Sequence, residues 1–232
     1  MITKEQLAKL IDYTLLKPDT TEDSIKGLCQ EAKEFKFYSV CVNPTYTSLA
    51  SSILRETEVK ICSVIGFPFG ASAPEVKALE TEITISNGAS EIDMVINIGA
   101  LKSQDYELVK KDISEVVRRA RASQKDIVVK VIIETGLLSK YEKERACKLV
   151  KESGANFVKT STGFNTTGAT VSDVKLLKKC VGPSIKVKAS GGIRSFRDAI
   201  KLIKAGADRI GTSSGVLIME QYSNKYKNRV IK

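Results

Sequence analysis

The sequence contains no histidine, and this absence excludes several kinds of catalytic site. Ser-His-Asp and Cys-His catalysis, histidine-ligated zinc and acid–base chemistry by an imidazole are all ruled out. Aldolases that depend on zinc held by imidazole ligands are excluded for the same reason. Any proton transfer must therefore use lysine, aspartate, glutamate, tyrosine or cysteine.

Cysteines are few, odd in number and scattered along the chain. They form no C-x-x-C pair, so they support neither a zinc ribbon nor a disulfide framework, and we expect reduced thiols, no metal and no cofactor. No apolar run approaches the roughly 20 residues of a membrane span. The mixed-charge N-terminus does not resemble a signal peptide, so we expect a cytoplasmic protein without membrane contact. The five cysteines are Cys29, Cys41, Cys62, Cys147 and Cys180.

Acidic residues are fewer than basic ones, with 27 Asp and Glu against 37 Lys and Arg and a net charge of +10. Such a surplus attracts anions, either nucleic acid or phosphorylated metabolites. Tryptophan is absent, and no run of Lys and Arg is interleaved with aromatic residues, so surfaces for base stacking are scarce. We therefore expect a small phosphorylated molecule, and not nucleic acid, as the partner.

Short apolar runs alternate with longer amphipathic stretches along the whole chain. Runs such as V-V-K-V-I-I are continuous, which is typical of strands covered on both faces. This alternation predicts a (β/α)8 TIM barrel with a short N-terminal helix, formed by residues 1–232 as one domain, with a doubly wound sheet as the alternative. Strands are expected at 11–15, 38–42, 60–66, 91–97, 127–134, 156–160, 185–189 and 208–212, and helices at 21–34, 44–55, 74–86, 105–122, 139–152, 172–179 and 195–205.

Local signals agree with these helices. Ser139 and Glu142 have the spacing of a capping box, and Ser195 with Asp198 is similar. The pairs Gly88-Ala89, Gly154-Ala155 and Gly206-Ala207 each follow a helical pattern, where glycine can end a helix in the left-handed conformation.

In a barrel, the residues that end the strands face a common site. Two lysines on neighbouring strand ends repel, so one loses its proton more easily and becomes a nucleophilic amine. Structural alternatives remain open, because a strand lysine can extend to the rim, a buried carboxylate can form an ion pair, and a cysteine is often a small core residue. These strand-end residues are Asp12, Thr14, Cys41, Asp93, Glu134, Lys159, Lys188 and Ser213.

Lys130 and Lys186 are further lysines on the predicted strands. For these two we expect buried ion pairs or a place at the floor of the barrel, with Glu134 as the partner.

Three glycine-rich turns follow the sixth, seventh and eighth predicted strands: T-S-T-G-F, S-G-G-I-R and G-T-S-S-G. Glycine lets backbone amides approach an anion closely, and each turn leads into a helix N-terminus. Phosphate sites in barrels lie in the loops after strands seven and eight. The turns therefore indicate a phosphorylated carbonyl substrate.

Five segments resemble the deoxyribose-phosphate aldolase family, in the family's order and over nearly the whole chain: I-D-Y-T-L-L-K-P, E-I-D-M-V-I-N, K-V-I-I-E-T-G, F-V-K-T-S-T-G-F and V-K-A-S-G-G-I-R. The resemblance implies a TIM barrel and a class I, metal-free aldolase. Such an enzyme reversibly cleaves 2-deoxy-D-ribose 5-phosphate into D-glyceraldehyde 3-phosphate and acetaldehyde, in deoxyribonucleotide catabolism. It also implies a homo-oligomer, a dimer or a tetramer.

The same resemblance implies roles for particular residues. Lys159 would form the Schiff base, Lys188 would keep Lys159 unprotonated and join the proton relay, and Asp93 would be the acid/base partner. The implied substrate and phosphate contacts are Asp12, Thr14, Cys41, Thr162, Gly163, Gly191, Gly192, Ile193, Arg194, Gly211, Ser213 and Ser214.

The sequence departs from the family pattern at several positions. Tyr13 stands where many relatives have histidine, and Phe164 stands where some have a phosphate-binding lysine. Some relatives end in a tyrosine that reaches the active site, but Tyr222 and Tyr226 are given no such role here.

Three other functions fit parts of the pattern. One is a different lysine-dependent barrel lyase, such as a transaldolase-like enzyme acting on another phosphorylated sugar. Another is a basic nucleic-acid-binding protein. The last is a barrel that has lost catalysis, although all three catalytic positions are present.

Overall fold

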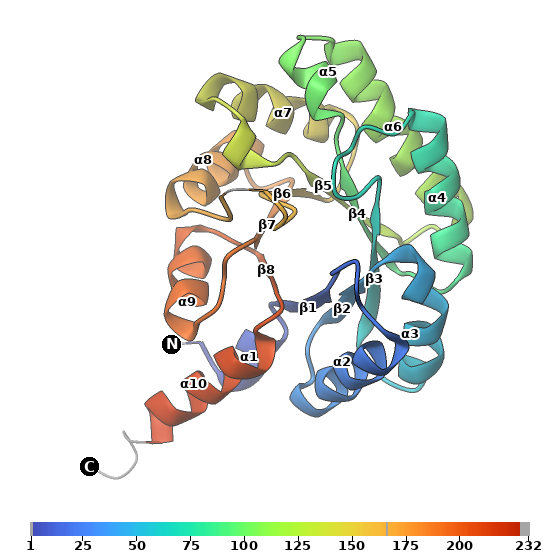
Figure 1. The fold of residues 1–232 in the computed structure, drawn as a ribbon. Helices are drawn as coiled ribbons and strands as arrows, with labels where there is room; N and C mark the ends of the chain where they lie inside the picture. The colour runs from blue at the N-terminus through green and yellow to red at the C-terminus, as the bar shows by residue number, and fades with distance from the viewer. Residues whose placement is uncertain (1, 166, 228–232) are drawn as a thin grey trace.

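The computed structural model describes residues 2–165 and 167–227, in which eight parallel strands close into a barrel surrounded by helices (Figure 1). The strands follow one another around the barrel in chain order, and β1 pairs with both β2 and β8. The predicted TIM barrel is therefore confirmed, and the doubly wound alternative is wrong because such a sheet leaves two edge strands unpaired. The strands are β1 (Ile11–Leu15), β2 (Ser39–Val42), β3 (Lys60–Ile65), β4 (Glu91–Val95), β5 (Val128–Ile132), β6 (Phe157–Lys159), β7 (Lys186–Ser190) and β8 (Arg209–Thr212).

The helices lie between successive strands on the outside of the barrel, except α1, which precedes β1 as the predicted short N-terminal helix, and α10, which follows β8. None of the described helices is both long enough and apolar enough to cross a membrane. The α-helices are α1 (Lys4–Ala8), α2 (Glu22–Phe35), α3 (Thr47–Leu54), α4 (Pro74–Ser86), α5 (Ile98–Lys102), α6 (Tyr106–Ser123), α7 (Lys140–Glu152), α8 (Val171–Val181), α9 (Phe196–Ala205) and α10 (Gly215–Lys227); the 3-10 helices are η1 (Pro44–Tyr46) and η2 (Thr135–Leu137).

The predicted helix signals have the expected local structure. Ser139 and Glu142 form the capping box of α7, in which each side chain accepts a hydrogen bond from the other residue's backbone N–H. The Ser195 hydroxyl accepts the N–H of Asp198 at the start of α9. Gly206 ends α9 with a φ of +113°, a conformation that a residue with a Cβ rarely adopts.

Two strands, β4 and β5, end two residues earlier than the sequence pattern predicts, and β3 and β6 end one residue earlier. β4 stops at Val95 because Asn97 caps a short helix, α5, by accepting the N–H of Ala100. β5 stops at Ile132, and Glu134 has a left-handed backbone with a φ of +57°. The helix expected at 44–55 divides into η1 and α3, and neither α5 nor α10 was predicted.

A buried ion pair fixes the end of β4 from outside the barrel. Lys77 of α4 lies 2.7 Å from Asp112 of α6, and both side chains are 0% exposed. Lys77 also donates to the carbonyl of Val95, while Asp112 accepts the N–H of Asn97. The pair therefore links two neighbouring helices to the strand that carries Asp93.

Replacing Lys77 with methionine should destabilise the fold strongly, because the Asp112 carboxylate stays buried without its cation. Breaking one side of a buried pair typically costs about 3–5 kcal/mol. Urea unfolding of the Lys77→Met variant measures this loss, and Lys77→Met/Asp112→Asn should recover most of it.

A matched control joins the same two helices at the surface, where Lys111 pairs with Glu75. Lys111→Met should leave the unfolding midpoint nearly unchanged. Equal losses in the buried and surface variants would contradict the proposed role of the buried pair.

Candidate active site

The carboxyl ends of the strands surround a cavity of about 360 Å³. It is formed by the loops that follow β1, β6, β7 and β8, so segments from both ends of the chain meet there. Ten of the predicted site residues line it: Thr14, Lys159, Thr162, Gly163, Gly191, Gly192, Ile193, Arg194, Gly211 and Ser213.

Five predicted residues do not line the cavity. Asp12, Cys41, Asp93 and Lys188 are all 0% exposed and lie inside the barrel. Asp12 and Cys41 are enclosed by other side chains in the barrel, and their contact with substrate stays a prediction. Ser214 is half-buried, and its backbone N–H donates to Thr212 Oγ1. Its predicted phosphate contact stays a prediction.

Lys159 ends β6 at the base of the cavity. Its Nζ lies 2.7 Å from Oδ2 of Asp93, and only 2% of the residue is exposed. Lys188 occupies the neighbouring position on β7, where the two Cα atoms are register partners. Of the two, only Lys159 lines the cavity, so its amine is the one that a substrate can reach.

Asp93 is the common partner of the buried lysines. Its Oδ2 lies 2.7 Å from both Lys159 and Lys188, and its Oδ1 lies 2.8 Å from Lys130. Burial alone raises the pKa of Asp93, but the ammonium groups of Lys130, Lys159 and Lys188 outweigh burial and hold this pKa well below its usual range. Asp93 is therefore an ionised carboxylate among three amines.

Lys188 lies between two carboxylates. Its Nζ is 2.5 Å from Asp12 and 2.7 Å from Asp93. Burial lowers the pKa of Lys188, but the two carboxylates raise it further, so the net shift is upward and the group remains an ammonium. The sequence predicted direct repulsion between two lysines, whereas in the structure one carboxylate oxygen bridges them.

The expected pairing of Lys130 and Lys186 with Glu134 is wrong. Lys130 is buried as predicted, but its partners are Asp93, at 2.8 Å, and Glu91, at 2.6 Å. Lys186 starts β7 and is exposed, with its ammonium 5.7 Å from the centre of the Phe157 ring.

Glu134 instead shapes the loop that follows β6. Its carboxylate accepts hydrogen bonds from the N–H and hydroxyl of Thr162 and from the amide of Asn165. Because Glu134 itself is fully buried, this loop is fixed where it borders the cavity.

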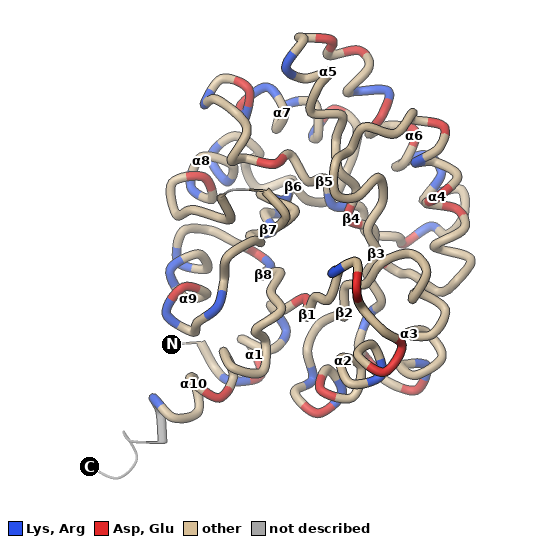
Figure 2. The backbone as a smooth tube through the Cα atoms, in the orientation of Figure 1, with Lys and Arg blue, Asp and Glu red and all other residues tan. Residues whose placement is uncertain are grey.

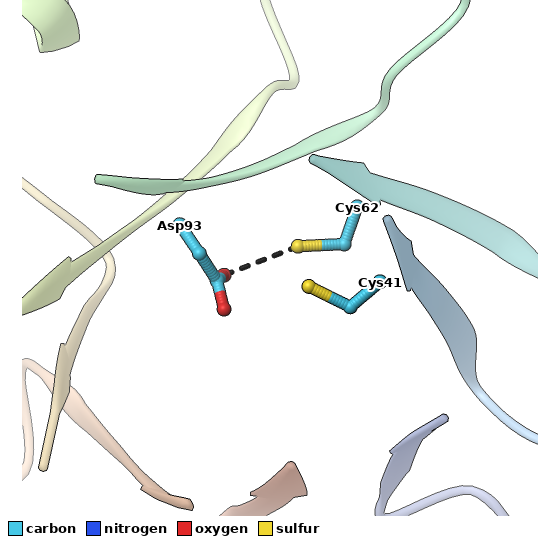
Figure 3. Close-up of side chains that lie close together, drawn as sticks. All are labelled: Cys41, Cys62 and Asp93. Carbon is cyan, nitrogen blue, oxygen red and sulfur yellow. Dashed lines mark hydrogen bonds between the residues drawn. The ribbon is translucent and has the colours of Figure 1, made fainter. Parts of the chain in front are cut away.

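Two thiols, Cys41 and Cys62, point toward Asp93 inside the barrel (Figure 3). Cys62 Sγ lies 3.1 Å from Asp93 Oδ1, and the three side chains are close enough together to offer ligand atoms to a metal. Burial raises the pKa of Cys62, and the Asp93 oxygens already contact three lysine amines. A divalent cation would have to displace these amines, so the local charge disfavours it.

Part of the cavity wall is suited to an anion. Gly191 and Gly192 line the cavity with φ angles of +88° and +73°. Because neither residue has a side chain, the backbone of this turn is open to the cavity. Arg194 and Lys17 also line the cavity, are exposed, and make no ion pair within the described part of the chain. Two cations and the backbone of a glycine turn therefore line the same cavity, a combination that suits an anion.

The residues that depart from the family pattern lie in different places. Tyr13 points away from the barrel interior and donates to Glu31 at 2.6 Å, which together with burial raises its pKa. Phe164 lines the cavity and packs edge-on against Phe67 at 5.3 Å. The Tyr222 hydroxyl donates to the carbonyl of Ile2, and the side chain of Tyr226 lies outside the described residues.

Sequence reasoning missed three functional candidates, Lys17, Glu91 and Arg209. Lys17 follows the β1 residues in L-L-K-P, and its position just beyond a strand end is a signal that could have found it. Glu91 and Arg209 are buried charged residues at the first positions of β4 and β8. Buried charges of this kind require partners. Which charges pair with which depends on the geometry of barrel closure.

Basic and acidic residues are interspersed over the outer helices (Figure 2). A closed barrel with a cavity at the carboxyl ends of its strands has the architecture of a TIM-barrel enzyme.

Comparisons with known proteins place the chain within this class. A family model described as DeoC/LacD family aldolase matches residues 7–220. The deoxyribose-phosphate aldolase of Carboxydothermus hydrogenoformans is 58% identical over 220 residues, which cover 95% of this chain and 96% of that protein. The chain belongs to the DeoC/LacD family of aldolases. It is therefore a carbon–carbon lyase.

Solved structures agree with this family. The structure titled "QR15, an Aldolase" superposes with a TM-score of 0.90 at 43% identity, covering 96% of this chain and 98% of that one. A deoxyribose phosphate aldolase from Aeropyrum pernix, described as tetrameric, gives a TM-score of 0.89 at 38% identity, covering 96% of this chain and 93% of that one.

Gly211 of β8 lies directly against Lys188. A Cβ added at Gly211 would be 3.0 Å from Lys188 Cε. The glycine therefore makes room for the lysine, which is a reason for its presence that differs from the predicted phosphate contact.

Gly211→Ala should lower turnover in aldol cleavage by about tenfold or more, because Lys188 must shift from its place between two carboxylates and small misplacements at a reacting centre are costly. Steady-state kinetics give the change. Gly27→Ala on the exposed face of α2, where an added Cβ meets nothing within 4 Å, is the control and should retain full turnover. Equal activity in both variants would rule out this role for Gly211.

Proposed function

We propose that the chain reversibly cleaves 2-deoxy-D-ribose 5-phosphate into D-glyceraldehyde 3-phosphate and acetaldehyde, with Lys159 forming the Schiff base. The observation that carries this proposal is the access of Lys159: it lines the cavity, whereas Lys130 and Lys188 do not. The 58% identity to a protein named deoxyribose-phosphate aldolase supports the substrate.

In the proposed reaction, the Lys159 amine attacks C1 of the open-chain aldehyde and loses water to form an imine. The protonated imine accepts the electron pair of the C2–C3 bond as that bond breaks, which leaves an enamine on Lys159 and releases the phosphorylated aldehyde. Protonation of the enamine at C2 and hydrolysis then release acetaldehyde and restore the amine.

Two proton transfers accompany this cleavage: the C3 hydroxyl loses a proton and C2 gains one. Asp93 is the nearest carboxylate to Lys159, and Lys188 contacts the same Asp93 oxygen. We propose that Asp93 and Lys188 move these protons, through water where the distance requires it. The fixed ammonium of Lys188 would also balance the Asp93 charge after Lys159 becomes an imine.

The phosphate would lie against the part of the cavity wall that the glycine turn forms. We propose that it is held by the backbone of the Gly191–Gly192 turn, by the hydroxyl of Ser213, and by Arg194 and Lys17. Phe164 occupies the position of a lysine in some relatives, so Lys17 would supply the second cation from a different loop. Anchoring the phosphate at a distance orients the aldehyde over Lys159.

We also propose that the chain works in the cytoplasm as a single-domain homo-oligomer. The relative from Aeropyrum pernix is described as tetrameric. One side of α4 exposes apolar side chains, with Val76, Leu79 and Ile83 each more than half exposed, and Phe69 lies nearby in sequence at 74% exposure. Exposed apolar groups of this extent are typical of contact surfaces between subunits.

Reduction with borohydride in the presence of acetaldehyde should add one ethyl group to Lys159, because the imine forms on the amine that the substrate can reach. Intact mass and peptide mapping locate the adduct, and Lys159→Ala should have neither adduct nor turnover. Lys188→Met tests the alternative nucleophile and should still be labelled on Lys159. An ethyl group on Lys188 in the unmodified sequence would overturn the assignment.

Lys17→Met and Arg194→Met should each lower kcat/KM for the phosphorylated substrate by about tenfold, since hydrogen bonds to charged groups contribute roughly 1.5–3 kcal/mol. Cleavage of unphosphorylated 2-deoxyribose should change little in the same variants. Lys60→Met, at the opposite end of the barrel, is the matched control. Equal losses on both substrates would show that these cations do not bind the phosphate.

A further inference from the structure

Six buried side chains form a closed ring of alternating charge inside the barrel. Lys188 contacts Asp12 and Asp93, at 2.5 and 2.7 Å, and Lys130 contacts Asp93 and Glu91, at 2.8 and 2.6 Å. Arg209 closes the ring by contacting Asp12, at 2.8 Å, and Glu91, at 3.6 Å. The charged ring is therefore Asp93, Lys130, Glu91, Arg209, Asp12 and Lys188.

The charged ring is shielded from solvent. Arg209 is 6% exposed, Glu91 is 2% exposed, and the other four members are 0% exposed. The guanidinium of Arg209 also lies 3.3 Å from the centre of the Tyr38 ring, which covers one of its faces. Charges in such surroundings interact strongly because little water screens them.

Every strand contributes an ionisable side chain to this interior. Besides the charged ring, β2 and β3 provide the thiols of Cys41 and Cys62, which we count as neutral, and β6 provides Lys159. The phenol of Tyr38 faces Arg209, and the hydroxyl of Ser39 donates to Asp12. No other charged group from the described strands contacts the charged ring.

The charge count singles out Lys159. Three carboxylates balance three cations within the charged ring, so its net charge is zero. A protonated Lys159 adds one positive charge beside Asp93. The buried carboxylate of Glu134 holds the loop after β6, which borders the same cavity, and it accepts its hydrogen bonds from Thr162 and Asn165 and not from the charged ring. Because little water screens charges in this interior, a change in the charge of the ring acts on the Lys159 amine through Asp93.

We propose that Arg209 and Glu91, which do not contact the cavity, are positioning residues that set this charge balance and thereby the pH at which Lys159 becomes a nucleophile. They act through the ring: Arg209 orients Asp12, and Asp12 holds Lys188 against Asp93. Glu91 likewise holds Lys130 on the other Asp93 oxygen. The inference rests on the proposed function of Lys159.

Removing a positive charge from the ring and removing a negative charge should shift the pH profile of imine trapping in opposite directions. Arg209→Met leaves the charged ring with one negative charge, so Lys159 should keep its proton longer and trapping should move up by about one pH unit. Glu91→Gln leaves one positive charge and should move the profile down by a similar amount. Glu91→Gln/Arg209→Met restores neutrality and should return it close to the original position.

The measurement is borohydride trapping with acetaldehyde across a pH series, with the ethyl adduct on Lys159 quantified by peptide mapping. Arg209→Lys keeps the positive charge but changes the shape of the side chain. Turnover of this variant should fall, while the pH profile of its imine trapping should not move. The surface pair Arg119–Glu82 offers a matched control, and Arg119→Met should shift nothing. Glu91→Gln is nearly isosteric, so it tests the inference even if Arg209→Met does not fold.

Shifts of opposite sign, with recovery in the double variant, would support the inference, because loss of packing alone has no such sign. A profile that does not move, or that moves the same way in both single variants, would overturn it. In those outcomes the adduct on Lys159 is still found, so the proposed function stands. Failure to label Lys159 in the unmodified sequence would instead reject the proposed function.

Discussion

The site depends on the contacts of one carboxylate, that of Asp93, with the three lysines inside the barrel. Without it, three amines would face one another in an interior that water does not reach. With it, each amine is held at a fixed distance and direction. The outer fold serves this arrangement, since Lys77 and Asp112 fix the end of the strand on which Asp93 lies.

In this barrel, the residues that balance the buried charges are different from the residue that reaches the cavity. The residues that balance charge, such as Asp12 and Glu91, are enclosed, whereas Lys159 reaches the cavity. The proposed phosphate contacts are a glycine turn and two exposed cations, Lys17 and Arg194, at the rim of the cavity. Changes at the rim can therefore alter which molecule binds while leaving the buried amines in place.

The sequence predicted the barrel and the meeting of Lys159 with Lys188, because strand periodicity and strand ends are local features. It could not predict that Lys130 contacts Asp93 and not Glu134, since partner choice inside a barrel depends on the stagger between strands. Asp12 was predicted at a strand end, and the family resemblance implied a substrate contact for it. The strand end was located correctly, but its depth in the barrel is a tertiary property.

The contact between Asp12 and Arg209 joins residues 197 positions apart in the chain. Such a contact forms only when the last strand meets the first. Closing so long a loop costs conformational entropy, so we expect this contact to form late in folding. Until then, Asp12 and Glu91 lack the guanidinium that completes their surroundings. A nascent or truncated chain without β8 therefore cannot assemble the balanced interior, which ties the chemistry of the site to completion of the whole barrel.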